Sequence, residues 1–245
     1  MRGKGALLLF TALGAAVPAH AQSLEGGPSA SPLSITFSAA SEERRRGLSS
    51  SDGDPVVGAA LSVPITDALT IDAAVTSLSN SARHGGADAV IEMGAGYATQ
   101  AGAWRLSAQA KYLAFPGASD QGYAEIGAGA GVLIGPAAID FSADYAPRQS
   151  AIGGDNLSLA TVASLGVPGT PFTVWARLGH HSGSVRDPLR AQRLRPDGSY
   201  WDHGAGVDWL QGRWSAGLRY SNSSIDGPGS RHAGAAVIGR LAVRL

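Results

Sequence analysis

The side chains best able to do chemistry are acids and bases that recur at every second position of strand-like segments. In residues 103–113, Arg105 and Lys111 share one face and Trp104 and Tyr112 the other, because successive side chains of a strand point to opposite faces. The same rule places seven acids and seven bases on polar faces: Asp72, Glu92, Glu125, Asp140, Asp144, Asp202, Asp208, Arg105, Lys111, Arg177, Arg213, Arg219, Arg240 and Arg244. A dry core would not tolerate these charges without partners, so the pattern predicts a water-facing wall.

Some of these charges are expected to pair across a hairpin at Gln211. A register in which paired residue numbers sum to 421 places Asp208 opposite Arg213 and Asp202 opposite Arg219. Opposite charges that face each other across strands contribute ~0.2–1 kcal/mol each. We therefore predict a wall of ion pairs on this hairpin.

A glycine-rich run, residues 127–131, precedes the turn at 135–136. Its spacing does not match the G-x-G-x-x-G fingerprint of dinucleotide sites. A register with numbers summing to 271 places Asp140 opposite Gly131 and Asp144 opposite Gly127. These glycines either leave a functional gap beside both acids or only relieve the curvature of the strand.

The longest connection, residues 182–199, is rich in arginine. Arg186, Arg190, Arg193 and Arg195 occur there beside two aspartates. Such a loop could fold into the mouth of a barrel, where it would favour anionic solutes or contact surface phosphates. The alternative is a solvated charged loop.

Catalytic and metal-binding patterns are weak. The sequence contains no G-x-S-x-G elbow, H-E-x-x-H helix or P-loop, which are the motifs of common hydrolase and nucleotide sites. His180 and His181 would point to opposite faces of a strand, so one metal could not easily hold both. We expect no catalytic residue, cofactor or metal, but His203 or His232 near a serine leaves a hydrolase open as an alternative.

The composition excludes several classes of protein. Among 245 residues, 16% are charged, 34 are glycine and none is cysteine, so disulfide frameworks and thiolate sites are excluded. The 19 basic residues equal the 19 acidic ones, whereas nucleic-acid binders normally carry a basic surplus. We expect no nucleic-acid partner. Low charge with near-zero mean hydropathy is typical of transmembrane β-barrels, in which apolar and polar residues alternate.

The first residues read as a secretory signal. Arg2 and Lys4 precede an apolar stretch, and Ala19 and Ala21 form a small-x-small cleavage site. The sequence predicts a cleaved signal peptide at 1–21 and one outer-membrane barrel domain at 22–245.

Twelve alternating segments follow, and their connections alternate in length. Short connections alternate with long ones at 44–54, 80–87, 114–121, 147–155, 182–199 and 223–232. Outer-membrane barrels have short periplasmic turns and longer extracellular loops. The fold class expected is all-β: an antiparallel up-and-down transmembrane β-barrel of about twelve strands with both termini periplasmic.

Aromatic residues support a lipid-facing outside. Trp104 and Tyr112 lie eight positions apart on the apolar face, as do Trp201 and Trp209. This spacing in a tilted strand corresponds to roughly 20 Å of height, which suits two interfacial girdles. Ordinary core aromatics are the alternative interpretation.

One stretch after the first segment resembles the R-G-x-S-x-S-D-x-x-P signature of the TorF family, porins of Gram-negative outer membranes. The matching residues, with a glycine that follows, are Arg46, Gly47, Ser49, Ser51, Asp52, Pro55 and Gly58. Weaker similarities lie at 115–117, 123–125 and 144–147. The sequence departs from the family pattern in having Val57 before the glycine, three successive arginines at 44–46, and Leu245 rather than phenylalanine at its end. The resemblance implies a channel and supplies no catalytic residues.

These observations favour an outer-membrane porin that permits passive diffusion of small polar solutes or ions. The expected partners are outer-membrane lipid and lipopolysaccharide, the barrel-assembly machinery and the solutes themselves. Two alternatives remain: a barrel hydrolase acting at the membrane surface, and a plugged structural or adhesive barrel whose lumen is filled by the Asp202–Arg219 and Asp208–Arg213 pairs.

Overall fold

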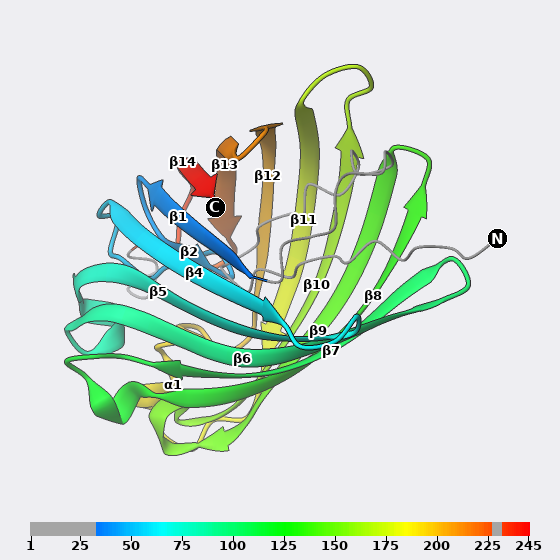
Figure 1. Ribbon diagram of the computed structural model, residues 1–245. Helices are drawn as coiled ribbons and strands as arrows, with labels where there is room; N and C mark the ends of the chain where they lie inside the picture. Colours follow the sequence, from blue (N-terminus) through cyan, green and yellow to red (C-terminus); the bar gives the residue numbers. More distant parts are fainter. Residues whose placement is uncertain (1–32, 227–231) are drawn as a thin grey trace.

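The computed structural model describes residues 33–226 and 232–245, so the predicted signal peptide lies outside the described residues. Twelve antiparallel strands close into one barrel in the order β1-β14-β13-β12-β11-β10-β9-β8-β7-β6-β5-β4 (Figure 1). The barrel strands are β1 (Ser34–Ala40), β4 (Val56–Pro64), β5 (Leu69–Ser81), β6 (Ala87–Ala101), β7 (Trp104–Ala114), β8 (Tyr123–Ile134), β9 (Ala137–Gln149), β10 (Gly154–Gly166), β11 (Phe172–Ser182), β12 (Tyr200–Gln211), β13 (Trp214–Ser223) and β14 (Ala236–Arg244). The predicted fold class is confirmed.

The remaining elements all lie in the longer connections. A two-stranded sheet pairs β2 (Arg44–Arg45) with β3 (Leu48–Ser49). The helical pieces are η1 (Ala82–His84), η2 (Ser119–Gln121), η3 (Ser150–Ile152) and α1 (Pro188–Ala191). No helix among the described residues is long and apolar enough to cross a membrane.

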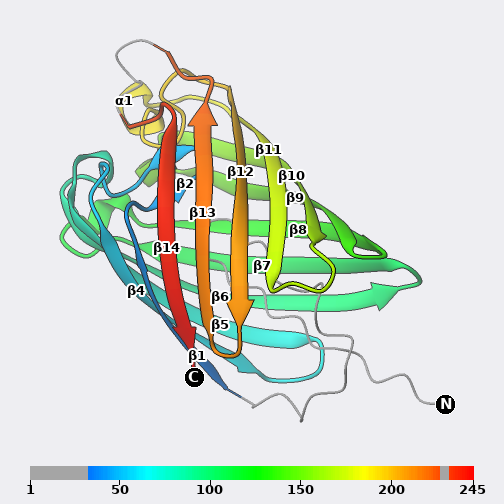
Figure 2. The ribbon, with the colours of Figure 1, turned by 90° about the horizontal axis from the view of Figure 1, so that it is seen from above.

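The barrel closes where β1 pairs with β14, and its two ends differ. Ile35 and Leu245 exchange backbone hydrogen bonds, so the start of β1 and the C-terminus lie at one end, opposite α1 (Figure 2). We call this the turn end, because the short connections lie there, and the opposite one the loop end. Two predicted long loops, 80–87 and 147–155, are shorter than expected, since β5, β6, β9 and β10 extend into them and leave only η1 and η3.

Two-residue turns fix the register at the turn end. Gly102, Gly135 and Gly212 each begin such a turn with φ near +60°, a conformation that glycine adopts without a steric penalty. At the second of them, Gly131 lies opposite Asp140 and Gly127 opposite Asp144, as predicted.

The register predicted for the Gln211 hairpin is wrong. Gln211 pairs with Trp214, so residue numbers sum to 425 and Gly212 and Arg213 form the turn. Asp202 therefore lies opposite Ser223, and Asp208 lies opposite Gly217. A register in which paired numbers sum to 421 would leave no residue for the turn. It would also leave unused the positive φ of Gly212, which suits a two-residue turn.

The outer wall is apolar all the way round. Large hydrophobic side chains that are well exposed occur on almost every barrel strand, including Phe37, Ile71, Met93, Leu106, Phe141, Leu178 and Leu241. Aromatic residues cluster toward both ends of this wall. Trp104, Phe172, Trp209 and Trp214 lie near the turn end, and Tyr112, Tyr145, Trp201 and Tyr220 lie toward the loop end.

The inside differs between the two ends. A buried apolar cluster fills the loop end and includes Leu78, Leu113, Phe115, Tyr123 and Ile152. Inward positions nearer the turn end carry small residues instead, among them Gly94, Gly96, Ser107, Gly129 and Ser142. The abundant glycine of the sequence is therefore concentrated partly on the inner wall.

Candidate functional site: a hairpin across the lumen

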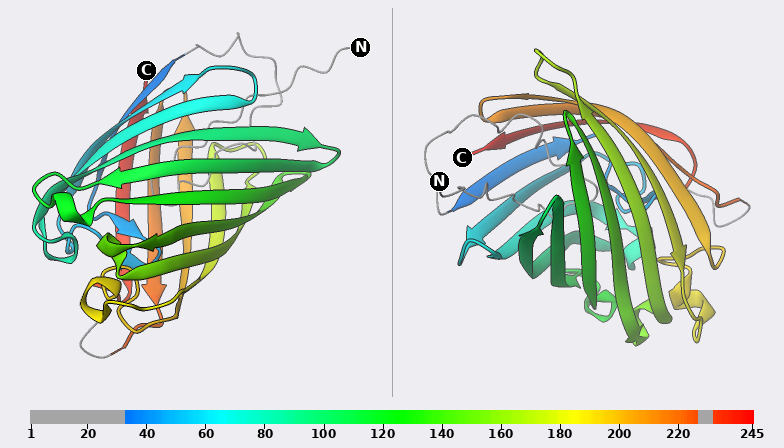
Figure 3. Two further views of the ribbon diagram at one scale, coloured as in Figure 1. Left: turned by 90° about the horizontal axis from the view of Figure 1, so that it is seen from below. Right: turned by 90° about the vertical axis from the view of Figure 1, so that its right-hand side faces the viewer.

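The segment between β1 and β4, residues 41–55, folds into the barrel rather than away from it (Figure 3). We call its β2–β3 unit the lumen hairpin. Its anchoring residues lie on β6, β8 and β9, and β9 is six positions from β1 in the twelve-membered ring. The lumen hairpin therefore spans the barrel from one side to the other.

Two arginines attach the lumen hairpin to the far wall. Arg45 contacts Glu92 at 3.2 Å and Glu125 at 3.0 Å. Arg46 contacts Glu125 at 2.7 Å and Asp144 at 3.6 Å. Because the Glu125 side chain is fully buried, these charge-assisted contacts act in a low-dielectric environment and are stronger than surface pairs.

Lys111 completes this cluster from β7. Its Nζ atom lies 3.4 Å from Glu125 Oε2, so three cations surround one buried carboxylate. Four of the residues predicted to face the lumen, Glu92, Lys111, Glu125 and Asp144, thus meet at one place. The alternation did not predict that Arg45 joins this cluster. In the sequence, Arg45 is only one of three successive arginines.

The motif residues build the lumen hairpin. Gly47 has φ +78°, and a Cβ atom there would lie 2.8 Å from that of Asp202. The Ser51 hydroxyl accepts from the Glu43 N–H and donates to the Asp54 carbonyl, and the Asp52 carboxylate accepts from Ala82 N–H. The Ser49 hydroxyl accepts from Gly53 N–H. These contacts give the motif a structural role in folding the chain inward.

The lumen hairpin is also held near the wall opposite its anchors. The Tyr200 hydroxyl donates to the Arg46 carbonyl at 3.0 Å. Arg44 pairs with Glu42 at 2.8 Å and donates to the Gly234 carbonyl. Leu48 is buried with Tyr200, Ile225 and Ala233.

The other predicted lumen residues lie apart from this cluster. Arg105 pairs with Asp140 at 2.6 Å, and Arg177 pairs with Asp202 at 3.0 Å. Asp72 accepts from the Ser62 hydroxyl, and Arg244 lies exposed at the turn end. Arg213 lies in a turn, so the Asp208–Arg213 pair does not form, and Asp208 accepts instead from the indole of Trp175.

The glycines at 127 and 131 leave no empty gap. A Cβ atom at Gly131 would collide with the carboxylate of Asp140, and one at Gly127 would collide with that of Asp144. Asp140 crosses Gly131 to reach Arg105 on β7, and Asp144 crosses Gly127 to reach Gln109. The glycines therefore let the aspartates bond two strands away.

Replacing Gly131 with alanine should lower stability by ~1–3 kcal/mol, because the new methyl group forces Asp140 away from Arg105. Urea unfolding of the refolded protein in detergent would measure the loss. The matched control is Gly239→Ala, where the nearest atom to a new Cβ is 3.9 Å away. Equal stability of the two variants would contradict this explanation of Gly131.

The loop arginines divide into two kinds. Arg186 is exposed and Arg190 is partly exposed, and Arg190 contacts Asp120 at 3.3 Å. Arg193 and Arg195 are buried, and Arg195 donates to the carbonyls of Asp155, Gly183 and Ser184. The solvated-loop interpretation holds only for the first two, because the second two hold the loops together.

Arg193 is the centre of the loop packing. It donates to the carbonyls of Gln121 and Ala151 at 2.6 and 3.1 Å and to His84 Nδ1 at 3.0 Å. Its guanidinium stacks 4.5 Å from the centroid of the Phe115 ring. Burial lowers the pKa of Arg193 to about 10 and keeps that of His84 well below its usual range.

Arg193→Lys should loosen the loops, because a single ammonium cannot reach three acceptors in different directions. We expect a loss of about 2 kcal/mol and faster tryptic cleavage within 183–199. Limited proteolysis measures this, with Arg190→Lys as the control, since the Arg190 side chain is partly exposed. Equal cleavage rates in the two variants would contradict the role of Arg193.

Histidines give no support to the hydrolase alternative. His180 contacts the Trp201 ring and His181 bonds Asp202, so the two face opposite ways, as predicted. Among residues 33–226 and 232–245, neither His203 nor His232 hydrogen-bonds to a serine hydroxyl. In the same described part of the chain, no three histidine or acidic side chains are arranged to hold a metal ion.

Comparisons with known proteins agree with the fold. A family model described as "Bacterial protein of unknown function (Gcw_chp)" matches residues 25–238. Solved structures with the same architecture include the KdgM porin, with TM-score 0.57, 8% identity, and coverage of 86% of this chain and 97% of that one. The NanC porin gives TM-score 0.56 and 9% identity over 86% and 98% of the two chains. No curated protein matches the sequence.

Proposed function

The chain belongs to the Gcw_chp family of bacterial proteins of unknown function, and we propose that it is an outer-membrane channel for passive diffusion of small polar solutes or ions. The observation that carries this proposal is the pair of opposed faces. An apolar wall with aromatic residues toward both ends surrounds an inner wall that bears charged side chains, among them Lys111, Glu125 and the Arg105–Asp140 and Arg177–Asp202 pairs. Such a wall suits lipid outside and water inside.

The same features support a location in the outer membrane. The apolar outer wall would contact outer-membrane lipid and lipopolysaccharide, and the turn end with both termini would face the periplasm. Export through a cleaved signal peptide at 1–21 and insertion by the barrel-assembly machinery are parts of this proposal. The resemblance to TorF porins in the lumen-hairpin motif supports it.

The lumen hairpin makes the channel narrow. A twelve-stranded barrel is only moderately wider than eight-stranded ones, whose interiors side chains can fill. A segment lying across it restricts passage to small solutes that pass beside it. The proposal therefore includes a steep dependence of permeation on solute size.

Liposome swelling tests the proposal. Vesicles containing refolded protein should swell in solutions of glycine or small sugars and should swell far more slowly in larger oligosaccharides. Protein-free vesicles provide the background rate. Swelling at the background rate for every solute would contradict passive diffusion.

A further inference from the structure

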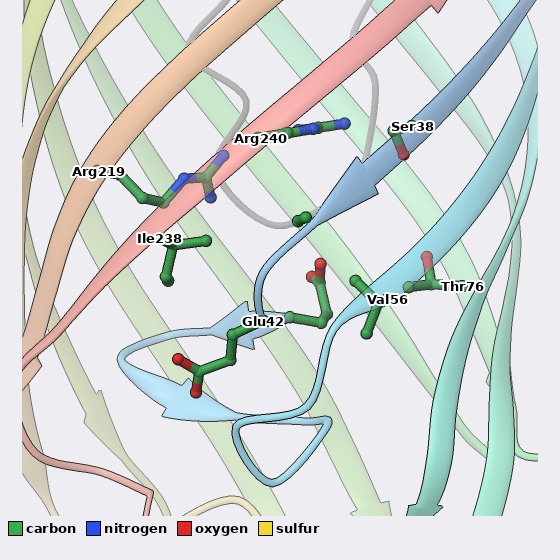
Figure 4. Close-up of a pocket in the computed structure, with 9 residues that line it drawn as sticks. Ser38, Glu42, Val56, Thr76, Arg219, Ile238 and Arg240 are labelled. Carbon is green, nitrogen blue, oxygen red and sulfur yellow. The ribbon is translucent and has the colours of Figure 1, made fainter.

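Two narrow spaces lie beside the lumen hairpin. One, toward β1 and β14, has a volume of about 20 Å³ and is walled by Val56, Thr76 and Ile238 (Figure 4). The other, of about 40 Å³, lies between the lumen hairpin and the loop of residues 183–199, which we call the lid. Since about 10–15 Å³ already accommodates one water, each space holds only a few waters. The width of the second space depends on where the lid lies.

The short helix η1 connects the lid with the lumen hairpin. The Arg83 guanidinium donates to the Ser49 carbonyl of the lumen hairpin at 2.7 Å and to the Arg193 carbonyl of the lid at 3.1 Å. Next to it, His84 Nδ1 accepts from Arg193 Nε at 3.0 Å, and its ring centroid lies 4.5 Å from that of Phe115. The lid is therefore tied to η1 at two points.

The charge of Arg193 is held by neutral groups. In the part of the chain that the structure describes, its acceptors are the carbonyls of Gln121 and Ala151 and the ring of His84, and its buried Nη2 atom has no hydrogen-bond partner. A buried cation without a counter-ion is costly. The closed lid therefore depends on each of these acceptors.

His84 can accept from Arg193 only while its Nδ1 atom carries no proton. A proton on Nδ1 would turn this acceptor into a donor and would place two cations at the 3.0 Å contact. Burial and the cations of Arg193, Arg83 and Arg45 hold the pKa of His84 well below its usual range. The closed lid and a protonated His84 thus exclude each other.

Resting on the proposed channel function, we infer that the His84–Arg193 contact is an acid-sensitive latch: protonation of His84 releases the lid, and the channel then enters a state of higher conductance. In the released lid, His84 is hydrated and has the ordinary histidine pKa of about 6.5. Below that pH the released state binds more protons than the closed state, so each further pH unit favours release by up to about tenfold.

Other titratable groups near the latch respond differently. His181 is also buried, but its Nε2 atom lies 2.6 Å from Asp202, so a proton there would strengthen an ion pair. Burial raises the pKa of Glu43 to about 7, so Glu43 loses its charge in the same pH range and needs its own variant. The remaining charged and titratable groups that line the cavity beside His84 are Glu92, Arg45, Arg46, Tyr123 and Tyr200.

Single-channel recording at pH 7.5 and pH 5.5 tests the latch. In the wild type, the time spent in the higher conductance level relative to the lower one should rise about tenfold at pH 5.5. His84→Gln should lose this change, because its amide oxygen can still accept from Arg193 but does not titrate. Glu43→Gln should keep it, and so should the control His203→Gln, since His203 is exposed on the outer wall.

Hydrogen exchange of the lid amides follows the release without any current. In the wild type, their protection relative to the turn at 167–170 should fall between pH 7.5 and pH 5.5. Unchanged protection would overturn the latch whether or not His84→Gln folds. An equal pH response of wild type and His84→Gln, or loss of the response in Glu43→Gln, would also overturn it and leave the channel intact. Absence of wild-type current at both pH values would instead contradict the proposed function itself.

Discussion

Replacing residues 42–53 by a short glycine-serine linker is expected to raise single-channel conductance at least about twofold, because this segment lies across the lumen. The barrel itself should survive, since β1 and β4 pair with each other over Ser34–Ala40 and Val56–Ser62 independently of the lumen hairpin. The measurement is single-channel recording at one salt concentration. The variant should also admit larger solutes in the swelling assay.

The control for this replacement is a change of equal kind at the turn end. Substituting residues 167–170 with glycine and serine alters a connection that does not enter the barrel. Its conductance should match that of the wild type. If the variant with the shortened lumen hairpin had no higher conductance than this control variant, the lumen hairpin would not be the constriction.

The second prediction concerns the buried carboxylate. Glu125→Gln keeps the shape of the side chain but leaves Arg45, Arg46 and Lys111 facing a neutral amide. Breaking a buried ion pair from one side costs about 3–5 kcal/mol, so stability should fall by that order. We expect the lumen hairpin to detach and the conductance to rise toward that of the shortened variant.

Two comparisons make this prediction specific. Asp140→Asn removes a partly exposed pair near the turn end and should cost about 1 kcal/mol or less without changing conductance. Glu125→Gln added to the shortened variant should change conductance no further, since the two changes act on one structure. Wild-type conductance in Glu125→Gln alone would contradict the anchoring role.

The sequence predicts the barrel well because every strand repeats the same two-residue period. The opposed charged and apolar faces follow from that period, and the Asp140–Gly131 register follows from the Gly135–Pro136 turn. The register predicted for the Gln211 hairpin is wrong because it rests on charge pairing, whereas the geometry of the turn decides the register. Gly212 with φ +59° fixes the turn, and Asp202 finds Arg177 and His181 on β11 instead.

The lumen hairpin could not be predicted from alternation, because long connections have no period that fixes their direction. The run Arg44–Arg46 and the residues of the motif marked the segment, but the anchoring partners of Arg45 and Arg46 lie about 50 to 100 positions away on β6, β8 and β9. The loop arginines illustrate the same limit. Arg190 and Arg193 look alike in sequence, and their roles differ because the fold buries Arg193 against Phe115 and gives its guanidinium hydrogen-bond acceptors.

The most direct measurement is single-channel recording of the refolded wild-type protein in a planar bilayer. The structure predicts discrete current steps of low conductance, because the barrel has a charged inner wall and the lumen hairpin narrows it. A protein that is folded and inserted, yet gives no current above the lipid background, would contradict the channel.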